Sequence, residues 1–304
     1  MKNIIALDIG GTSIKSAIVN SNGIFLENSC NIISINSNKD RDYILSKFIH
    51  PIKENIKLLN TTKNSFDGIA VSICGPFDYE KGICLIKNLD KYESIYKQNI
   101  KKILQEKLSI SYDIPFVFDP DAWSFGRGEV CFNDYENYKK IIVFTMGTGI
   151  GSCFIDNKKV VSKGKGVPWF GWISGQEYKN GILNDFTSSI YMQNLYFKKT
   201  NEKIDIKTMA ERARNNDQIA KHIFNEMGNT LGFFLKKNFV EEFKTECIIF
   251  GGQISLSADL FIDKIKYHLK DCTCIKNITK AKDIKFAALK GAAQILLSDN
   301  YKYV

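Results

Sequence analysis

Long apolar runs, histidines and prolines are all scarce in this sequence. No apolar run among the 304 residues is long enough to span a bilayer, which excludes a membrane-spanning helix. The N-terminus has no charged segment followed by an apolar one, so no secretory signal is visible. We therefore expect a cytoplasmic protein with no membrane partner. A chain of this length suits two domains better than one.

Zinc-binding patterns are also missing. The three histidines, His50, His222 and His268, lie in helix-like stretches and lack zinc-ligand spacing to a cysteine pair. Of the eight cysteines only Cys272 and Cys274 are close together. We expect no zinc, and we expect reduced thiols, as is usual in the cytosol.

The formal net charge of +9 is not gathered in one segment. Lysines are scattered among asparagines and isoleucines along the whole chain, whereas a nucleic-acid-binding protein usually concentrates its basic residues. The pattern favours a compositional bias, and we expect no nucleic-acid partner.

A strand-like run near the N-terminus ends in an acid and a glycine turn, in the stretch KNIIALDIGGTSIK. The residues of interest are Asp8, Gly10, Gly11, Thr12 and Lys15. The glycines either form an ordinary hairpin turn or bring backbone N–H groups close to a phosphate. Asp8 would repel a phosphate unless a metal ion lay between them. This stretch alone does not decide between a hairpin turn and a phosphate-binding turn.

The same pattern occurs twice. Residues 3–30 are predicted to form strand, glycine turn, strand, turn and strand, and residues 139–162 repeat this order at an offset of 137 residues. The offset aligns Asp8 with Thr145 and Gly10 with Gly147. Two unrelated hairpins are the alternative, but the shared glycines and threonine favour a duplicated unit.

The rest of the chain alternates between helical and strand-like segments, which indicates an α/β protein. Helices are expected over 39–60, 91–108, within 205–242 and over 286–297, and strands over 68–73, 114–119 and 246–252. We place the domain boundary between Pro120 and Glu129. The expected domains are 1–121, joined by the last helix (287–304), and 122–286.

Two glycine turns at equivalent points of a repeat suit a polyphosphate ligand. Asp8 in the first turn suits a hydrated Mg²⁺ ion. The second turn is free of acids and suits direct phosphate contact through Thr145, Gly147, Thr148 and Gly149.

Five segments together resemble the ROK family (repressors, open reading frames, kinases) of the actin-like ATPase superfamily. They are LDIGGTSIK, GIAVSICGP, TMGTGIG, IIFGG and LKGAAQIL, in the family's order. The resemblance implies two RNase-H-like domains with ATP and Mg²⁺ in the cleft between them. It also implies a sugar as phosphoryl acceptor and a homodimer. Gly251 and Gly252 would then let the backbone approach the adenosine.

The resemblance assigns roles to further residues. Asp121, in PDAWSFGRGE, matches the family's catalytic aspartate, although an aspartate there can also simply cap the following helix. Asn88 and Gly75 match elements of the sugar pocket.

The sugar-binding segments depart from the family's pattern. Pro120 replaces an asparagine, Trp172 a glutamate and Gly175 a histidine, while Asn184 replaces a second glutamate and Ile182 a zinc-binding cysteine. The phosphate-binding half is thus intact, whereas the usual sugar clamp is largely changed. We still expect Trp172 and Asn184 to contact the acceptor.

Trp172 lies close in sequence to Trp169 and Phe170. The three aromatic side chains either stack on a sugar or serve packing or a dimer contact, and the sequence favours neither.

The leading hypothesis is an ATP-dependent carbohydrate kinase with Asp121 as general base and Mg-ATP as phosphoryl donor. The alternative is a non-catalytic sensor of nucleotide or sugar. The first predicted strand begins at residue 3, which argues against a repressor of the family, because those repressors carry an N-terminal DNA-binding domain. The length argues against an actin or a chaperone, which carry large insertions.

Overall fold

The computed structural model describes residues 2–298, which form two units. Unit 1 contains residues 2–132 and 285–298, and unit 2 contains residues 133–284. The division after residue 132 differs from the expected one after residue 121, because α3 (Asp121–Cys131) packs on α9 (Ala287–Leu297) within unit 1. The end of the expected last helix, 299–304, lies outside the described residues.

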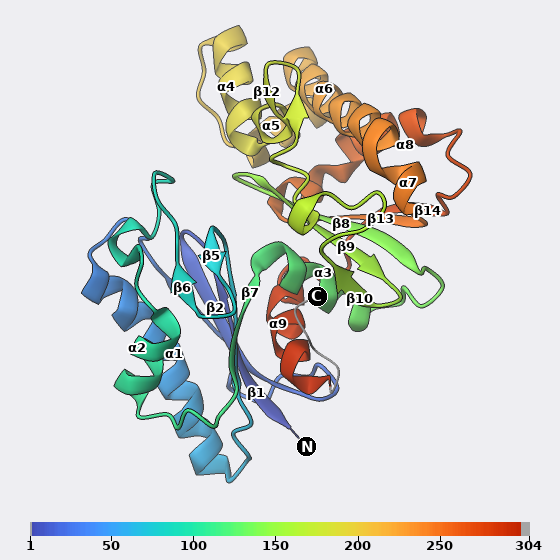
Figure 1. Cartoon of the computed structure of the whole chain (residues 1–304). Helices are drawn as coiled ribbons and strands as arrows, with labels where there is room; N and C mark the ends of the chain where they lie inside the picture. Colours follow the sequence, from blue (N-terminus) through green and yellow to red (C-terminus); the bar gives the residue numbers. More distant parts are fainter. Residues whose placement is uncertain (1, 299–304) are drawn as a thin grey trace. The chain divides into compact units, whose positions relative to one another are not determined.

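Unit 1 is built on a five-stranded sheet in the order β3-β2-β1-β4-β7 (Figure 1). Strands β1, β4 and β7 are parallel, and β2 and β3 complete an antiparallel meander with β1. The strands are β1 (Asn3–Ile9), β2 (Ser13–Asn20), β3 (Asn31–Ser34), β4 (Ile69–Ile73) and β7 (Phe116–Pro120), with a small hairpin of β5 (Phe77–Asp78) and β6 (Ile83–Cys84).

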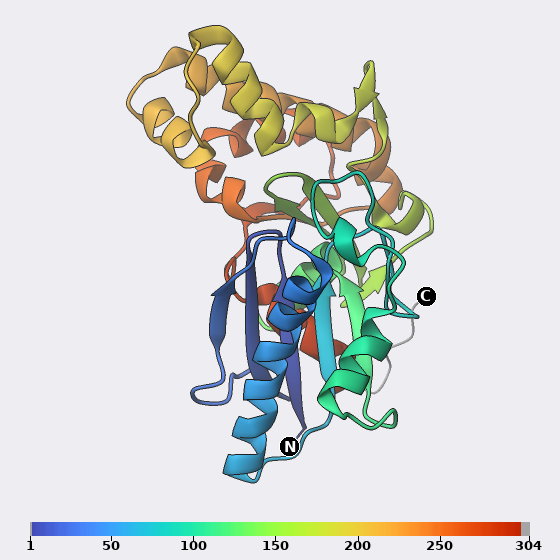
Figure 2. The same ribbon diagram turned by 90° about the vertical axis from the view of Figure 1, so that its left-hand side faces the viewer.

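Helices cover both faces of this sheet (Figures 1 and 2). Ile5, Leu7 and Ile9 of β1 pack in the cluster that includes α1 (Arg41–Thr62) and α2 (Ile100–Leu108). The alternate residues Ile4 and Ala6 pack against α9 on the other face, as the two-residue period of a strand requires. Asp8 shares the α9 face with them.

Two predicted elements of unit 1 are shifted. The third strand, expected over 23–30, is Asn31–Ser34, because the buried hydroxyl of Ser29 accepts from the Ile18 amide (3.1 Å) and donates to the Leu26 carbonyl (2.6 Å), stabilising a loop there. The helix expected over 91–108 starts at Ile100, where Asn99 caps it by accepting from the Lys102 amide at 2.9 Å. Only the short turn η1 (Glu93–Ile95) precedes it.

The sheet of unit 2 has the same topology as that of unit 1. Its order is β10-β9-β8-β13-β14, with an antiparallel meander followed by parallel strands. The predicted repeat is therefore confirmed at the level of the fold. The strands are β8 (Lys140–Met146), β9 (Ile150–Asp156), β10 (Lys159–Val161), β13 (Cys247–Gly251) and β14 (Asn277–Lys280), with a separate hairpin of β11 (Glu177–Tyr178) and β12 (Gly181–Ile182).

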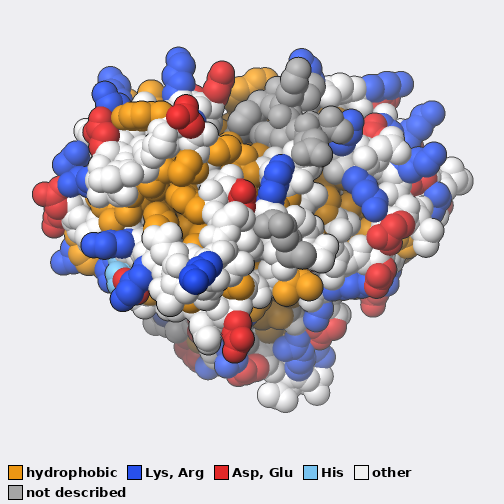
Figure 3. Space-filling model, turned by 90° about the horizontal axis from the view of Figure 1, so that it is seen from below, with side chains coloured by type: hydrophobic (Ala, Val, Ile, Leu, Met, Phe, Trp, Pro, Cys, Tyr) orange, Lys and Arg blue, Asp and Glu red, His pale blue; other side chains and the backbone are white. Residues whose placement is uncertain are grey.

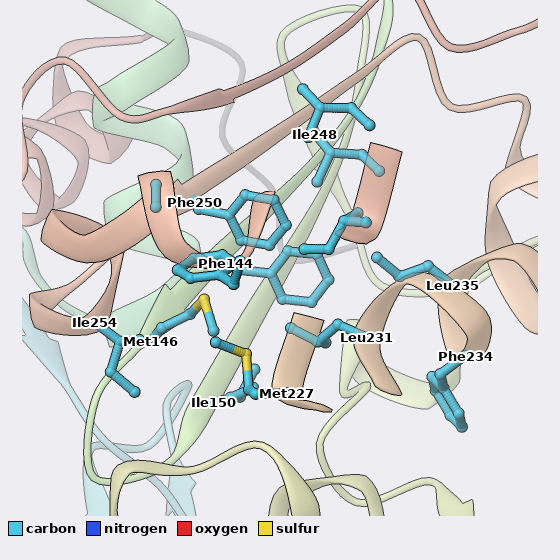
Figure 4. Packing of buried hydrophobic residues seen from close by; sticks show 14 of the residues in the cluster. Phe144, Met146, Ile150, Met227, Leu231, Phe234, Leu235, Ile248, Phe250 and Ile254 are labelled. Atoms are coloured by element: carbon cyan, nitrogen blue, oxygen red, sulfur yellow. The ribbon is translucent and has the colours of Figure 1, made fainter. Parts of the chain in front are cut away.

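The core of unit 2 lies between its sheet and a layer of helices. Phe144 and Phe250, on the adjacent strands β8 and β13, stack with ring centroids 5.4 Å apart, and Met227 and Leu231 of α6 pack in the same cluster (Figure 4). The helical elements are η2 (Trp169–Gly171), η3 (Leu183–Phe186), α4 (Ser189–Thr200), α5 (Ile206–Arg214), α6 (Gln218–Leu235), the π-helical turn η4 (Lys236–Val240), α7 (Glu241–Phe243), η5 (Gln253–Leu260) and α8 (Ile262–Leu269).

None of the helices among residues 2–298 has the length and apolar character needed to cross a membrane.

Candidate functional site

Three predicted site residues of unit 1 follow adjacent parallel strands. Ile9 of β1 pairs with Ile73 of β4, and Ile73 pairs with Pro120 of β7, so the three strands end at one edge of the sheet. The glycine turn, Gly75 and Asp121 therefore come directly after neighbouring strand ends. Ligands of open α/β sheets bind at this edge, outside the carboxyl ends of the strands.

Asp8 is held by two neighbours on the sheet. Lys15 lies opposite it on β2, and its ammonium is 2.8 Å from Asp8 Oδ2. Ser72 lies opposite it on β4 and donates to Asp8 Oδ1 at 3.2 Å. A single carboxylate with both oxygens already engaged fits a contact to magnesium through water better than a direct bond.

The first glycine turn is closed and anchored by the backbone. The Gly10 amide donates to the Ser13 carbonyl at 2.9 Å, and the Tyr92 hydroxyl donates to the Gly10 carbonyl. Gly11 and Thr12 at the tip are exposed. Burial raises the pKa of Tyr92, so its hydroxyl keeps its proton and stays a donor.

Asp121 is the first residue of α3, and its Oδ1 accepts from the Ala122 amide at 2.8 Å. Pro120 occupies the N-cap position. Desolvation by the surrounding protein raises the pKa of Asp121, as do the charges of Asp8 and Asp119, whereas the Ala122 amide and Lys91 lower it. The residue remains accessible to solvent, which moderates the desolvation. An accessible carboxyl with a raised pKa is suited to proton transfer.

A buried ion pair fixes the segment that leads to Asp121. Asp119 is fully buried and accepts from Arg127 at 2.8 Å and from Ser124 at 2.6 Å. Arg127 also donates to the Gly291 carbonyl at 3.2 Å. The network joins β7, α3 and α9, so the start of α3 is held on both sides.

The second glycine turn follows β8 in unit 2. Thr145 pairs with Gly251 on the parallel strand β13, which brings two predicted nucleotide-binding segments together. A Cβ atom at Gly252 would lie 2.4 Å from the Met146 carbonyl oxygen, and the φ of Gly252 is +79°, so this close approach requires glycine.

The turn itself is closed by the Gly147 amide, which donates to the Gly149 carbonyl at 2.9 Å. A Cβ atom at Gly147 would meet no described atom within 4 Å, which leaves its backbone open to approach.

Asn184 supports this turn. Its Oδ1 accepts from the Ile150 amide at 3.1 Å, and a Cβ atom at Gly149 would lie 3.0 Å from the same oxygen. The expected contact with the acceptor remains a prediction, because the observed contacts are with the second glycine turn.

Trp172 packs on Gly175, the residue that stands where a histidine was expected. A Cβ atom at Gly175 would lie 2.9 Å from three atoms of the indole. The glycine in place of the histidine therefore leaves the space that the tryptophan in place of the glutamate occupies. Trp172 remains 50% exposed. Ser152 of β9 anchors the segment by donating to the Gly171 carbonyl at 2.6 Å and accepting from the Ile173 amide at 3.0 Å.

The other two aromatic residues pair with each other. The rings of Trp169 and Phe170 have centroids 5.6 Å apart, and Trp169 is 77% exposed. The Trp172 indole, by contrast, packs on Gly175, and half of its surface stays exposed.

The loop that carries Asn88 is unusual in its backbone. Asn88, Asp90 and Tyr92 all have positive φ values, of 58°, 51° and 56°, a conformation that costs free energy for residues other than glycine. Glu93 holds the loop by accepting from the Leu89 amide at 2.9 Å and from the Asp90 amide at 3.2 Å.

Among residues 2–298, no group of three or more His, Cys, Asp or Glu side chains is arranged to hold a metal ion.

The model of the ROK family matches residues 4–299. The chain belongs to the ROK family. It is 26% identical to a beta-glucoside kinase from Listeria innocua over 282 residues, covering 88% of this chain and 87% of the relative. It is 20% identical to a xylose repressor from Caldicellulosiruptor bescii, covering 97% of this chain and 76% of the relative.

A solved structure of a ROK family glucokinase from Streptomyces griseus, in complex with glucose and AMPPNP, superimposes with a TM-score of 0.75 at 20% identity. The match covers 96% of this chain and 98% of that chain. The structure thus has the fold of actin-like ATPases, as the motifs predicted.

Four residues of this ROK chain were not predicted from its sequence. Ser72 and Tyr92 contact Asp8 and Gly10, and Arg127 holds Asp119, two residues before Asp121. Lys91 acts on Asp121 through its charge. Only Ser72 had a usable signal, because a parallel pairing of GIAVSI with NIIALDI places it opposite Asp8.

Proposed function

We propose that this protein is an ATP-dependent kinase that phosphorylates a hydroxyl group of a carbohydrate. The arrangement of Asp8, Gly75 and Asp121 around three adjacent parallel strand ends carries the proposal. The resemblance to kinases that act on beta-glucosides and glucose supports a sugar as acceptor.

In the proposed reaction the acceptor hydroxyl attacks the γ-phosphorus of ATP. The new O–P bond forms as the bond from the γ-phosphorus to the ADP oxygen breaks, and the hydroxyl proton passes to the Asp121 carboxylate. Each unit offers a glycine turn, after β1 and after β8, whose backbone N–H groups suit phosphate oxygens. Mg²⁺, when bound to the nucleotide, neutralises phosphate charge, and Asp8 would hold it through water.

The proposal is tested by offering a panel of sugars, amino sugars and glycosides with Mg-ATP and reading phosphate adducts by mass spectrometry. Asp121→Asn keeps the size of the side chain and an oxygen for the Ala122 amide. We expect it to lower kcat by about 10²–10⁴-fold while ATP affinity stays near that of the wild type. Near-normal turnover by this variant would show that Asp121 is not the base.

The second candidate is a sensor that binds nucleotide or sugar without catalysis, and the likeness to a xylose repressor favours it. A kinase consumes ATP in an acceptor-dependent manner, whereas a sensor binds sugar and yields no phosphate adduct with any compound of the panel. Measuring ATP hydrolysis with and without each sugar separates the two.

A further inference from the structure

A cavity of about 470 Å³ lies beside the sheet of unit 1. One wall comes from residues 28–33, which lead into the edge strand β3, and the other from residues 50–61 of α1, the helix that runs along this face of the sheet (Figure 2). None of the lining residues belongs to the candidate functional site. The volume falls within the range of about 300–1,000 Å³ that is typical of small-molecule sites.

The helical wall contains a buried polar side chain without a partner. Asn55 lines the cavity and lies on the buried side of α1, between Ile52 and Leu59. It is 1% exposed, and its Nδ2 has no hydrogen-bond partner among residues 2–298. A buried donor left unpaired costs free energy and is rare in folded proteins, so it requires an explanation.

A second unpaired group lies on the sheet. Ser16 of β2 is 1% exposed, and its Oγ also lacks a partner in the described part of the chain. Ser16 pairs with Asn31 of β3, which lines the cavity, so the two side chains lie on the same face. This is the α1 face, because Ile14 and Ile18, two residues away on either side, pack in the cluster that includes α1.

The strand-side wall is held in place by hydrogen bonds of its own. Asn28 has a left-handed backbone with a φ of 60°, and the next residue, Ser29, is fixed by the Ile18 amide and the Leu26 carbonyl. Asn31 Nδ2 donates to the Ser29 carbonyl at 3.3 Å. The loop that replaces the expected strand thus places two asparagine side chains at the cavity, in an arrangement that a ligand need not create.

The polar lining consists mainly of groups that both donate and accept hydrogen bonds. Three asparagine amides, the Thr61 hydroxyl and the His50 imidazole line the cavity. A half-turn about the last side-chain bond exchanges the two ends of an asparagine amide, so Asn55 can present its donor or its acceptor. Hydroxyl groups have the same double capacity and are therefore the matching ligand groups.

The remaining lining residues give the cavity no net charge and an apolar contact surface. Lys57 and Glu54 contribute one charge of each sign, whereas Ile33, Pro51 and Leu58 are apolar. A ligand of either charge gains little from such a balanced lining, while the C–H groups of a carbon skeleton can pack on the apolar side chains.

We propose that this cavity binds a small, uncharged, polyhydroxylated compound, a sugar or a polyol, with one hydroxyl group paired to the amide of Asn55. The site goes beyond the proposed function, because none of its residues takes part in the proposed phosphoryl transfer. It stands or falls independently of the kinase activity.

Hydrogen exchange read by mass spectrometry tests the site, because amide protection shows where a ligand binds. The neutral probes are glucose and sorbitol. Gluconate and N-methylglucamine are the charged counterparts of sorbitol, with the same number of carbons in the main chain. We expect the neutral probes, added without nucleotide, to slow exchange in residues 28–34 and 50–61, and the charged ones to do so at least about 10-fold less tightly.

Asn55→Leu removes the unpaired donor at similar volume, so the variant should fold and melt no lower than the wild type. We expect it to weaken the binding of the neutral probes about 10-fold or more, the effect of a lost hydrogen bond in a buried site. Asn31→Ala, at an exposed position of the opposite wall, should weaken binding in the same direction and carries the test if Asn55→Leu does not fold. Asn60→Leu is the matched control, since Asn60 is an exposed asparagine of α1 outside the cavity lining.

Protection of both segments that Asn55→Leu or Asn31→Ala weakens and Asn60→Leu retains would support the site, whether or not any compound is phosphorylated. Three results would overturn it. They are no protection of these segments by glucose or sorbitol, which would mean that water alone fills the cavity, equal protection by the charged probes, and equal weakening by Asn60→Leu. Protection confined to the segments of Asp8, Gly75 and Asp121 would also overturn it and would leave the proposed kinase function untouched.

Discussion

The raised pKa of Asp121 suits its carboxyl to proton transfer and lowers the stability of the folded state at a pH where the carboxyl is ionised. Its pKa is raised in the folded state, with desolvation as the largest cause. At a pH below the unfolded-state value of about 3.9 both states carry the proton and the group is neutral to stability. As the pH rises, the unfolded state releases its proton first, so stability is lost between the unfolded and the folded pKa.

We therefore expect Asp121→Asn to melt at a higher temperature than the wild type at neutral pH, with the difference vanishing as the pH falls toward about 3.5. Thermal unfolding followed over this pH range measures it. The acidic limb of the wild-type kcat profile should lie above the ordinary aspartate range for the same reason. A variant less stable than the wild type at neutral pH would contradict the raised pKa.

Trp172 is the residue whose role the sequence left open between ligand contact and packing. Its indole packs on Gly175 yet stays half exposed. We expect Trp172→Ala to raise the KM of the acceptor about 2- to 10-fold, the value of one aromatic contact, and to leave the KM of ATP unchanged.

Trp169→Ala is the control for this experiment, since Trp169 is more exposed and packs against Phe170 instead. If Trp172→Ala lowers only the melting temperature and leaves the kinetics alone, Trp172 serves packing.

At the scale of elements, the crossing of α3 and α9 depends on two glycines. A Cβ atom at Gly291 would lie 1.8 Å from the Ser124 carbonyl oxygen, and one at Gly128 would lie 1.8 Å from the Ala287 carbonyl oxygen. The two backbones therefore touch, and the buried Arg127 donates across the same contact to Gly291.

Gly291→Ala should lower the free energy of unfolding by about 3 kcal/mol or more, because the helices must move apart. In an unconstrained helix the same change from glycine to alanine stabilises the helix by about 1 kcal/mol. Urea denaturation measures the effect, with Gly11→Ala as control, since its nearest described neighbour would be 4.0 Å away. A gain in stability for Gly291→Ala would show that the helices are not in backbone contact.

At the scale of the whole molecule, we predict that the purified protein contains no zinc. The sequence has no cluster of cysteines, and Gly175 stands where the resemblance led us to expect a histidine ligand. Elemental analysis should find well under one zinc per chain, and one tightly bound zinc per chain would contradict the prediction.

A homodimer also stays a prediction. Light scattering coupled to gel filtration should give twice the chain mass of 34.6 kDa, and a single-chain mass across the accessible concentration range would contradict it.

The basic residues of the chain are scattered along its whole sequence. On the face shown in Figure 3, lysine and arginine side chains are interspersed with aspartate and glutamate. A nucleic-acid-binding surface would gather the positive charge in one stripe or patch. That nucleic acid is not a partner stays a prediction, which a binding assay at low salt would test.

The sequence by itself determined the repeated α/β unit, the family and the glycine turns. Those features depend on local order: an apolar strand, an acid or threonine at its end, and glycines that only a turn or a close backbone approach requires. The prediction of a third strand over 23–30 was wrong. The alternation in GIFLENSC does not reveal that the buried hydroxyl of Ser29 stabilises a loop there.

Only the tertiary structure decided what surrounds the site residues. The pairing of Asp8 with Ser72 and the anchoring of Gly10 by Tyr92 join residues far apart in the sequence. Such contacts arise from strand order and from a loop with left-handed residues, neither of which has a local signature. The position of α3 in unit 1 was likewise decided by its packing on α9 at the far end of the chain.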